Sequence, residues 1–464
     1  MVNANDIQYT QVPEPFWGLP KEMPRIPDSV YCNRLQKLLT KMQERNLDFI
    51  FIYADREHYG NFDYLVGYGP RFEEALLIIN KEGDSWTLLG NECLGMANYS
   101  RIPTEKILFQ SFSLPNQPID KLKSLDQVLI QIGLLSTHKV GLVGWKLMYP
   151  NYGNAFESDI PSFITDRIRE VVGKEQAMNV TDLFIDPESG IRVINDAHEI
   201  AYFEYGATYA SDSAQQILIN ARTGLTEVEL SQFATYGALP TSAFPKVISG
   251  NRLDMGMVSP TTNKIKLGER FQVTMALLGG LTCRKGFAAY TEADLVSEAR
   301  DYMERFMKPY FALVCNWYEM MEVGTNCGNI YNMVEATFPK AQYGWYLNPG
   351  HLIAIEEWLS SPIYKDSPTT IKSGMCLQMD IIPSVPSAYA SPNCEDGIAI
   401  ADEKLRGEIK ELYPDVYERM ENRRNFMRDV LNIQVKPEVL PLSNLAGLYR
   451  PFVLNKDMAL TVKK

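Results

Sequence analysis

The sequence predicts two domains, an α/β domain over residues 30–187 and an α+β domain over residues 188–464. Three observations support this fold class. The chain has 464 residues, which is too long for one ordinary hydrophobic core. Its first part alternates helical patterns with short apolar strands, whereas its second part places a long helix before a set of strands. Between them, the segment "FIDPESGIRVIND" interrupts the pattern with proline, glycine and acidic residues.

Apolar patterning defines the elements of the N-terminal half. Residues 1–29 contain spaced prolines and form an extended lead-in. Ser29 or Asp28 then caps a helix in which Leu35 and Met42 fall on one face. The following buried strands are "LDFIFIYA", "ALLIIN" and "SWTLLG", and a helix "DQVLIQIGLL" precedes a further strand, "KVGLVGW".

The C-terminal half begins with the longest predicted helix, "AHEIAYFEYGATYASDSAQQILINA", which ends before Gly224. Thr226 caps the next helix, with Glu229 at the capping-box position. The remaining elements are strands "RFQVTMALLG" and "LTCRKGFAAY", helices from Asp294 and at "GNIYNMVEATF", strands around 376–383 and 395–401, and a charged helix interrupted at Pro414.

Composition excludes several classes of partner. The net charge of -12 disfavours nucleic acid and anionic membranes, because both need basic patches for binding. No apolar run approaches the roughly 18 residues of a membrane span. The seven cysteines are scattered without any CxxC pair, which is typical of reduced thiols, and the start of the chain is polar. We therefore expect a cytoplasmic protein whose partners include neither nucleic acid nor a membrane.

Short motifs in a fixed order give this chain a family resemblance. From Arg192 onward these are "RVINDAHEI", "FPKVISGN", "IKLGERFQV", "NPGHLIAI", "IKSGMCLQMDIIP" and "CEDGIAIAD". Together they resemble the landmarks of the creatinase/aminopeptidase P/methionine aminopeptidase family, the pita-bread hydrolases. The first half resembles the creatinase-like domain that precedes this fold, so the resemblance covers about residues 30–405. It implies a homodimer that hydrolyses C–N bonds in a small-molecule or dipeptide-like substrate.

The resemblance also implies a set of metal ligands, which this chain keeps only in part. Family peptidases hold two divalent metals with two aspartates, one histidine and two glutamates. His351, Asp380 and Glu395 stand at the last three of these positions, but the two aspartates fall at Thr274 and Arg284. A guanidinium about 4 Å from a dication is repelled by roughly 8 kcal/mol at an effective dielectric of about 20. We therefore expect no dinuclear centre and no cofactor, with a weak single-metal site left open.

Creatinase itself offers a metal-free precedent, in which a histidine acts as general acid and base. Its expected position, a few residues after "SGN", is Met257 in this chain, and the second histidine of the family's "GHGxGxxxHE" run falls at Trp358. The sequence thus follows neither the peptidase pattern nor the creatinase pattern in full.

The candidate catalytic residues are His351, Asp380 and Glu395, because carboxylates beside an imidazole orient it and raise its pKa. Four residues are candidates for substrate binding: Arg284, Arg71, Asp254 and Trp358. Three of them have a simpler alternative, namely an internal salt bridge for Arg284, a surface ion pair for Arg71 and core packing for Trp358.

Three functional hypotheses follow. The first, which we favour, is a metal-independent hydrolase of a small amidino, amide or peptide-like substrate. The second is a metal-dependent Xaa-Pro aminopeptidase or dipeptidase. The third is a non-catalytic ligand-binding family member whose pocket is filled by Arg284.

Overall fold

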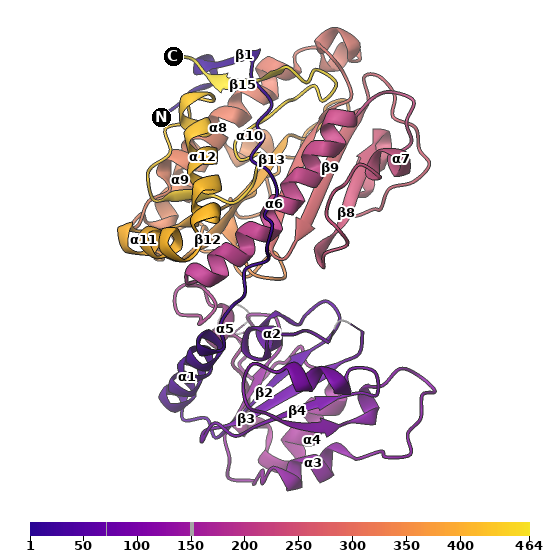
Figure 1. Ribbon diagram of the computed structural model, residues 1–464, viewed down its shortest axis with the longest axis vertical. Helices are drawn as coiled ribbons and strands as arrows, with labels where there is room; N and C mark the ends of the chain where they lie inside the picture. Colours follow the sequence, from indigo (N-terminus) through magenta and orange to yellow (C-terminus); the bar gives the residue numbers. More distant parts are fainter. Residues whose placement is uncertain (71, 149–152) are drawn as a thin grey trace. The chain divides into compact units, whose positions relative to one another are not determined.

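The computed structural model describes residues 1–70, 72–148 and 153–464. The chain forms two compact units (Figure 1), one of residues 26–193 and one that combines residues 1–25 with 194–464. The first residues thus belong to the C-terminal unit rather than forming a lead-in of their own.

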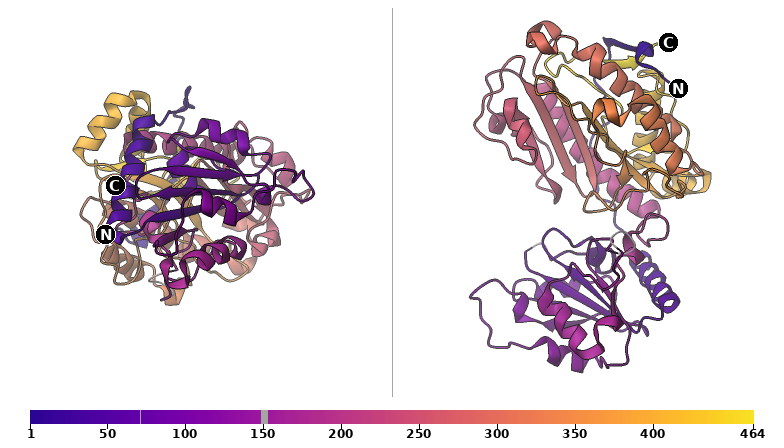
Figure 2. Two further views of the ribbon diagram at one scale, coloured as in Figure 1. Left: turned by 90° about the horizontal axis from the view of Figure 1, so that it is seen from below. Right: turned by 180° about the vertical axis from the view of Figure 1, so that it is seen from behind.

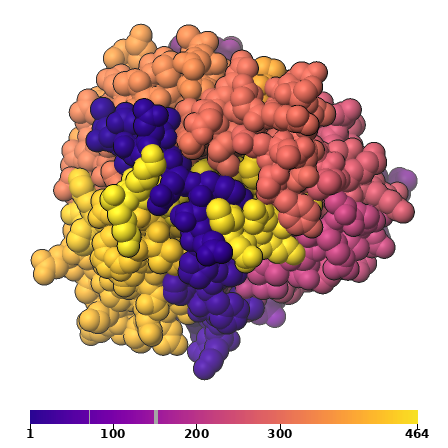
Figure 3. Space-filling view, turned by 90° about the horizontal axis from the view of Figure 1, so that it is seen from above, coloured from indigo at the N-terminus to yellow at the C-terminus, as the bar shows by residue number. Residues whose placement is uncertain are grey.

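A two-stranded sheet holds the N-terminus in that unit. Strand β1 (Ile7–Gln11) pairs antiparallel with β15 (Met458–Val462), with Ile7 opposite Val462. Figure 3 shows the N-terminal segment in indigo beside the yellow C-terminal residues. Because β1 pairs with a strand at the far end of the chain, the lead-in folds with the second unit.

The N-terminal unit is a mixed six-stranded sheet of order β5-β4-β3-β2-β6-β7 with helices around it. Its strands are β2 (Phe49–Ala54), β3 (Ala75–Asn80), β4 (Ser85–Leu89), β5 (Glu105–Leu108), β6 (Val140–Val143) and β7 (Ala177–Asn179). Its helices are α1 (Asp28–Arg45), α2 (Gly60–Val66), α3 (Leu125–Gln131), α4 (Ser162–Val172) and α5 (Asp182–Ile185). This confirms the predicted α/β class, although α2, α4, α5, β5 and β7 were not predicted.

The C-terminal unit is built on an antiparallel seven-stranded sheet of order β11-β12-β13-β10-β9-β8, with β14 paired to β13. Its strands are β8 (Thr241–Ser249), β9 (Arg270–Leu277), β10 (Gly280–Phe287), β11 (His351–Leu352), β12 (Cys376–Met379), β13 (Asn393–Ile400) and β14 (Val439–Pro441). Its helices are α6 (Ala197–Asn220), α7 (Glu227–Ser231), α8 (Lys308–Met320), α9 (Cys327–Thr337), α10 (Lys340–Tyr343), α11 (Glu403–Leu412) and α12 (Pro414–Asp429).

Helix α6 covers one face of this sheet along β9 and β10 (Figure 1), and the view from behind in Figure 2 shows the strands in front of it. Asp196 caps the helix and forms a capping box with Glu199. Within α6, the buried Glu204 carboxylate pairs with Arg419 and Arg423 of α12. These ion pairs tie α6 to the C-terminal helices, so the helical layer behind the sheet is held at a fixed position.

The predicted cap of α7 provides a first test of the local structure. Thr226 Oγ1 accepts the backbone N–H of Glu229, and the Glu229 carboxylate accepts the N–H of Thr226. Thr226→Ala is expected to lower the free energy of unfolding by about 1 kcal/mol, because it leaves one helix N–H without its partner. Urea unfolding of this variant beside Thr226→Ser, which keeps the hydroxyl, measures the difference.

Among the segments that differ from the sequence prediction, two have a clear local reason. No helix begins at Asp294, because its carboxylate accepts the N–H groups of Tyr290 and Thr291 and so closes a short turn. Strand β8 was not predicted, since Pro245 lies within it. It forms an edge of the sheet, where a missing N–H is tolerated, and its pairing with β9 is irregular. None of the described helices has the length and apolarity needed to cross a membrane.

Candidate functional site

Strand alternation gathers the candidate residues on one face of the seven-stranded sheet, here called the site face. Thr274 of β9 lies opposite Cys283 of β10, which in turn lies opposite Glu395 of β13. Asp380 directly follows β12, whose register with β13 continues towards Glu395. His351 of β11 lies opposite Gln378, two residues before Asp380. Since side chains alternate along a strand, all of these point to the same side.

The predicted catalytic residues meet on the site face. One ligand atom each of His351, Asp380 and Glu395 lies within 4.8 Å of the others, and all three side chains are buried. The Nδ1 atom of His351 lies 3.1 Å from the carbonyl oxygen of Leu352, which can only accept, so Nδ1 carries the proton. This contact leaves Nε2 as the atom that faces the carboxylates.

Trp358 lies at the border of this cluster, which is where a substrate-binding residue would have to lie. Its ring stacks on the His351 imidazole with a centroid separation of 3.9 Å and an interplanar angle of 20°. The tryptophan is 38% exposed whereas the imidazole is fully buried. One face of Trp358 therefore covers the histidine, and the rest of the ring borders solvent.

Glu357 is a functional candidate that the sequence analysis missed. Its Oε1 atom lies 3.1 Å from His351 Nε2, and its side chain is 14% exposed. It follows a tight turn in which the Glu357 N–H donates to the carbonyl of Ala354, and its φ is +78°. Such a left-handed conformation costs energy in a non-glycine residue and is concentrated at functional sites. The only sequence signal was the pair Glu356–Glu357 shortly after His351.

The close carboxylates change the protonation of the cluster. Burial raises the pKa of Asp380 to about 6, and the neighbouring Glu357 carboxylate adds to this effect. Burial, together with Asp380 and Glu357, raises the pKa of Glu395 well above its usual range. Burial opposes the charge on His351, but the Glu357 and Asp380 carboxylates hold the imidazole pKa above its usual value. The Asp380 and Glu395 carboxylates, which lie within 4.8 Å of each other, require a proton or a cation between them.

Several buried polar atoms in the cluster have no hydrogen-bond partner among the described residues. They are His351 Nε2, Glu357 Oε1, Asp380 Oδ1, Gln378 Oε1 and Asn393 Oδ1. Buried polar groups are almost always paired, so a concentration of unpaired ones indicates a place where a ligand or ion binds. The four oxygen atoms are acceptors, and so is the imidazole nitrogen when the proton is on Nδ1. These atoms therefore fit a ligand that donates hydrogen bonds, or a cation.

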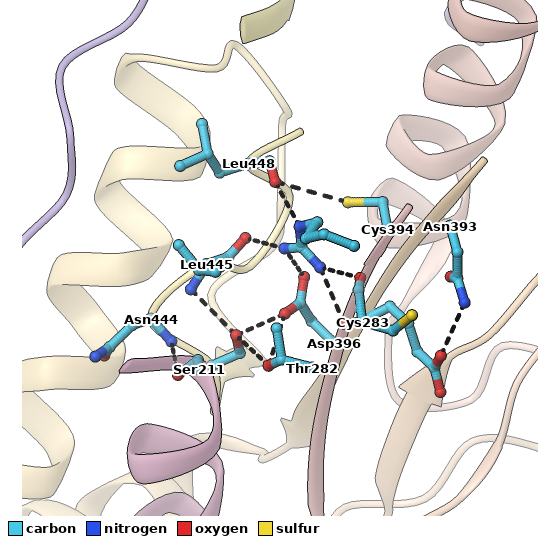
Figure 4. A network of polar contacts seen from close by, with 12 residues as sticks. Ser211, Thr282, Cys283, Asn393, Cys394, Asp396, Asn444, Leu445 and Leu448 are labelled. Carbon is cyan, nitrogen blue, oxygen red and sulfur yellow. Dashed lines mark hydrogen bonds and ion pairs between the residues drawn. The ribbon is translucent and has the colours of Figure 1, made fainter. Parts of the chain in front are cut away.

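Arg284 does not belong to this cluster, which corrects its proposed place in the site. Its neighbour Cys283 faces the cluster, so the Arg284 side chain points to the opposite side of the sheet. There its Nη2 lies 2.6 Å from Asp396 Oδ2, and both side chains are buried. The guanidinium also donates to the carbonyl oxygens of Leu445 and Leu448. Figure 4 shows the network formed by Thr282, Asp396 and these carbonyls.

Gln272, Thr274 and Cys283, which face the cluster from β9 and β10, are neutral side chains. Gln272 Nε2 donates to Thr274 Oγ1, which lies 3.0 Å from Cys283 Sγ. Burial raises the pKa of the Cys283 thiol to about 11, so it is uncharged at neutral pH. The His351–Asp380–Glu395 group fits one divalent cation, whereas these three side chains supply no carboxylate to bridge a second.

The other candidates lie away from the cluster or outside the described residues. Asp254 is an exposed residue whose carboxylate pairs with Arg270, with Oδ1 2.6 Å from Nη1. This ion pair is a sufficient account of Asp254, and it corrects the expectation that this residue lies near the site. Arg71 falls outside the described residues. In the same N-terminal unit, His58 stacks on Trp145 at 3.8 Å and contacts Asp55.

No known family pattern matches the chain, and no curated protein matches it in sequence. Solved structures, in contrast, match most of its length. A prolidase from Thermococcus sibiricus superimposes with a TM-score of 0.62 at 16% identity, covering 80% of this chain and 95% of that chain. An Xaa-Pro dipeptidase from Bacillus anthracis gives 0.59 at 15%, covering 81% and 96%. An X-Pro aminopeptidase from Thermotoga maritima gives 0.59 at 12%, covering 80% and 95%.

The chain has the creatinase/aminopeptidase P fold. This confirms the two-domain pita-bread architecture expected from the order of the sequence motifs. Within this fold, His351, Asp380 and Glu395 occupy one face of the sheet together, and Thr274 and Cys283 complete the row across β9 and β10.

Proposed function

We propose that this protein hydrolyses a C–N bond in a small amide, amidine or peptide-like substrate at the cluster of His351, Asp380 and Glu395. One observation carries the proposal, namely that three buried groups able to accept or donate protons lie within 4.8 Å of one another. A further support is that similar solved structures bear the names of dipeptidases and aminopeptidases.

Each side chain has a task in such a hydrolysis. His351 Nε2 is the ring nitrogen that faces the carboxylates, because Nδ1 is held by the carbonyl of Leu352. It exchanges a proton when no cation is bound, and it serves as a ligand instead when one is. Asp380 and Glu395 orient the attacking water and accept its proton. Lys246 and Lys285, which are partly buried and lower the pKa of Asp380, supply positive charge for a substrate carboxylate. These lysines take the part first given to Arg284.

The position of Arg284 on the opposite face of the sheet also affects the expected role of metal. The metal-independent hypothesis relied on a guanidinium inside the site, and that charge is instead neutralised by Asp396 behind the sheet. We therefore include one divalent cation in the proposal, held by His351, Asp380 and Glu395. When bound, such a cation polarises a carbonyl group or lowers the pKa of a bound water.

A substrate screen tests the proposed function. Purified protein, first stripped with a chelator and then supplied with Mn²⁺, Co²⁺ or Zn²⁺, is incubated with Xaa-Pro and other dipeptides, amino-acid amides and guanidino compounds. Mass spectrometry detects the products. We expect hydrolysis of at least one class, with the amine or ammonia released in equal amount to the acid, and a rate restored by added metal.

Two results would argue against parts of this proposal. If the protein hydrolyses substrate at the same rate before and after metal stripping, the cation is not part of the mechanism, and a metal-free mechanism is favoured. Absence of any turnover over the whole panel, in protein that is folded by circular dichroism, would contradict the hydrolase.

A further inference from the structure

The pairing of Glu357 with His351 is the least usual contact of the site. With the proton of the neutral imidazole on Nδ1, the Nε2 atom carries a lone pair and can only accept. The atom 3.1 Å away is a carboxylate oxygen of Glu357, which is also an acceptor. Neither atom has another partner in the described part of the chain. Two acceptors that face each other in a buried site need a positive charge, which is either a proton on Nε2 or a cation bound by both atoms.

The separation of these atoms fits ligands of one metal ion. Metal–ligand bonds to histidine nitrogen and carboxylate oxygen are about 2.0–2.2 Å long, so neighbouring ligands at 90–110° lie about 3.0–3.4 Å apart. The Nε2–Oε1 distance of 3.1 Å lies within this interval. His351, Asp380 and Glu395 form the group whose ligand atoms lie within 4.8 Å of one another, and Glu357 is joined to that group through its contact with Nε2.

Backbone and packing hold Glu357 at this point. The turn that begins at Ala354 directs the chain back over His351, and it does so with Glu357 in the left-handed region at φ +78°. The next residue, Trp358, fixes the turn by stacking on the imidazole. A strained residue kept in place on both sides by packing is typical of a side chain whose position matters for function.

We infer that Glu357 is the fourth protein ligand of a mononuclear divalent-cation site whose other ligands are His351, Asp380 and Glu395. The inference rests on the proposed function for the cation itself, and goes beyond it in assigning the ligand from the β11 loop. In this arrangement Glu357 supplies the negative charge that the neutral β9 and β10 side chains, Thr274 and Cys283, do not.

Cobalt binding tests this assignment without measuring activity. Metal-stripped full-length protein is titrated with Co²⁺ alone, followed by calorimetry and by visible absorption. We expect one equivalent to bind the wild type, and Glu357→Gln to weaken the affinity by about 10- to 100-fold, in the range known for changes around metal ligands. The visible spectrum of the bound cobalt should also change, because water replaces a carboxylate. Glu298→Gln, at an exposed glutamate of the same unit, is the matched control and should bind like the wild type.

The outcomes separate the two proposals. If wild type and Glu357→Gln bind Co²⁺ with equal affinity and identical spectra, Glu357 is no ligand, and the three-residue cation site stands. If the folded wild type binds no Co²⁺, the cation and this inference both fail, and hydrolysis must be metal-free. If cobalt binds as expected but no substrate is turned over, the ligand assignment holds and the hydrolase fails.

Discussion

Replacement of His351 by asparagine is expected to reduce kcat/KM by about 100- to 10,000-fold, the range for loss of a general acid or base. Asparagine retains a polar group of similar size but can neither transfer a proton at neutral pH nor offer the Nε2 lone pair. The imidazole is fully buried and stacked on Trp358, so the fold of the variant must be checked first by circular dichroism and thermal unfolding. Steady-state rates on the best substrate of the screen then give the effect.

A matched control for this substitution exists in the N-terminal unit. His138 is partly exposed, and its Nδ1 accepts only the N–H of Leu135. His138→Asn should keep the wild-type rate. A folded His351→Asn protein with more than a tenth of wild-type kcat/KM would show that His351 is a structural residue of the core rather than the acid and base.

Removal of Arg284 should have the largest effect on stability. Arg284→Met leaves the buried Asp396 carboxylate without its cation, and breaking a buried ion pair in this way costs about 3–5 kcal/mol. The carbonyl oxygens of Leu445 and Leu448 also lose a donor. Chemical denaturation followed by tryptophan fluorescence should show the transition of the C-terminal unit at a clearly lower denaturant concentration.

Two further variants separate charge from packing at this position. Arg284→Met with Asp396→Asn should recover part of the loss, because the second change removes the unpaired charge. Arg428→Met removes an exposed arginine paired only with neighbours on α12, and should change stability by less than about 1 kcal/mol. If Arg284→Met were as stable as wild type but raised KM strongly, the guanidinium would bind substrate, contrary to its place behind the sheet.

Local rules predicted much of the fold from the sequence. Thr226 caps a helix as its spacing with Glu229 indicated, since a capping box depends only on neighbouring residues. Runs of apolar residues predicted β2 and β3, because this pattern also depends only on neighbouring residues. Strand β8 was not predicted because a proline such as Pro245 argues against a central strand. A proline is tolerated in an edge strand, but whether a strand lies at an edge depends on the arrangement of the whole sheet.

The site was predicted in part. Motif order brought His351, Asp380 and Glu395 together correctly as a cluster, but counting along a motif placed Arg284 beside them. Strands β9 and β10 are joined by a two-residue turn of Leu278 and Gly279, both at positive φ. This turn sets the register in which Thr274 pairs with Cys283. "LLGG" lacks the usual turn signal, so the register was not readable. Glu357 was missed because its direction depends on a left-handed backbone that no local pattern requires.

The most direct test of the one-cation site is an anomalous difference map from crystals of the full chain soaked in Mn²⁺ or Co²⁺. We predict a single peak bonded to His351, Asp380 and Glu395, with Glu357 as the fourth protein ligand. A second peak beside Thr274 and Cys283, or no peak at the cluster in crystals that diffract after soaking, would contradict the account.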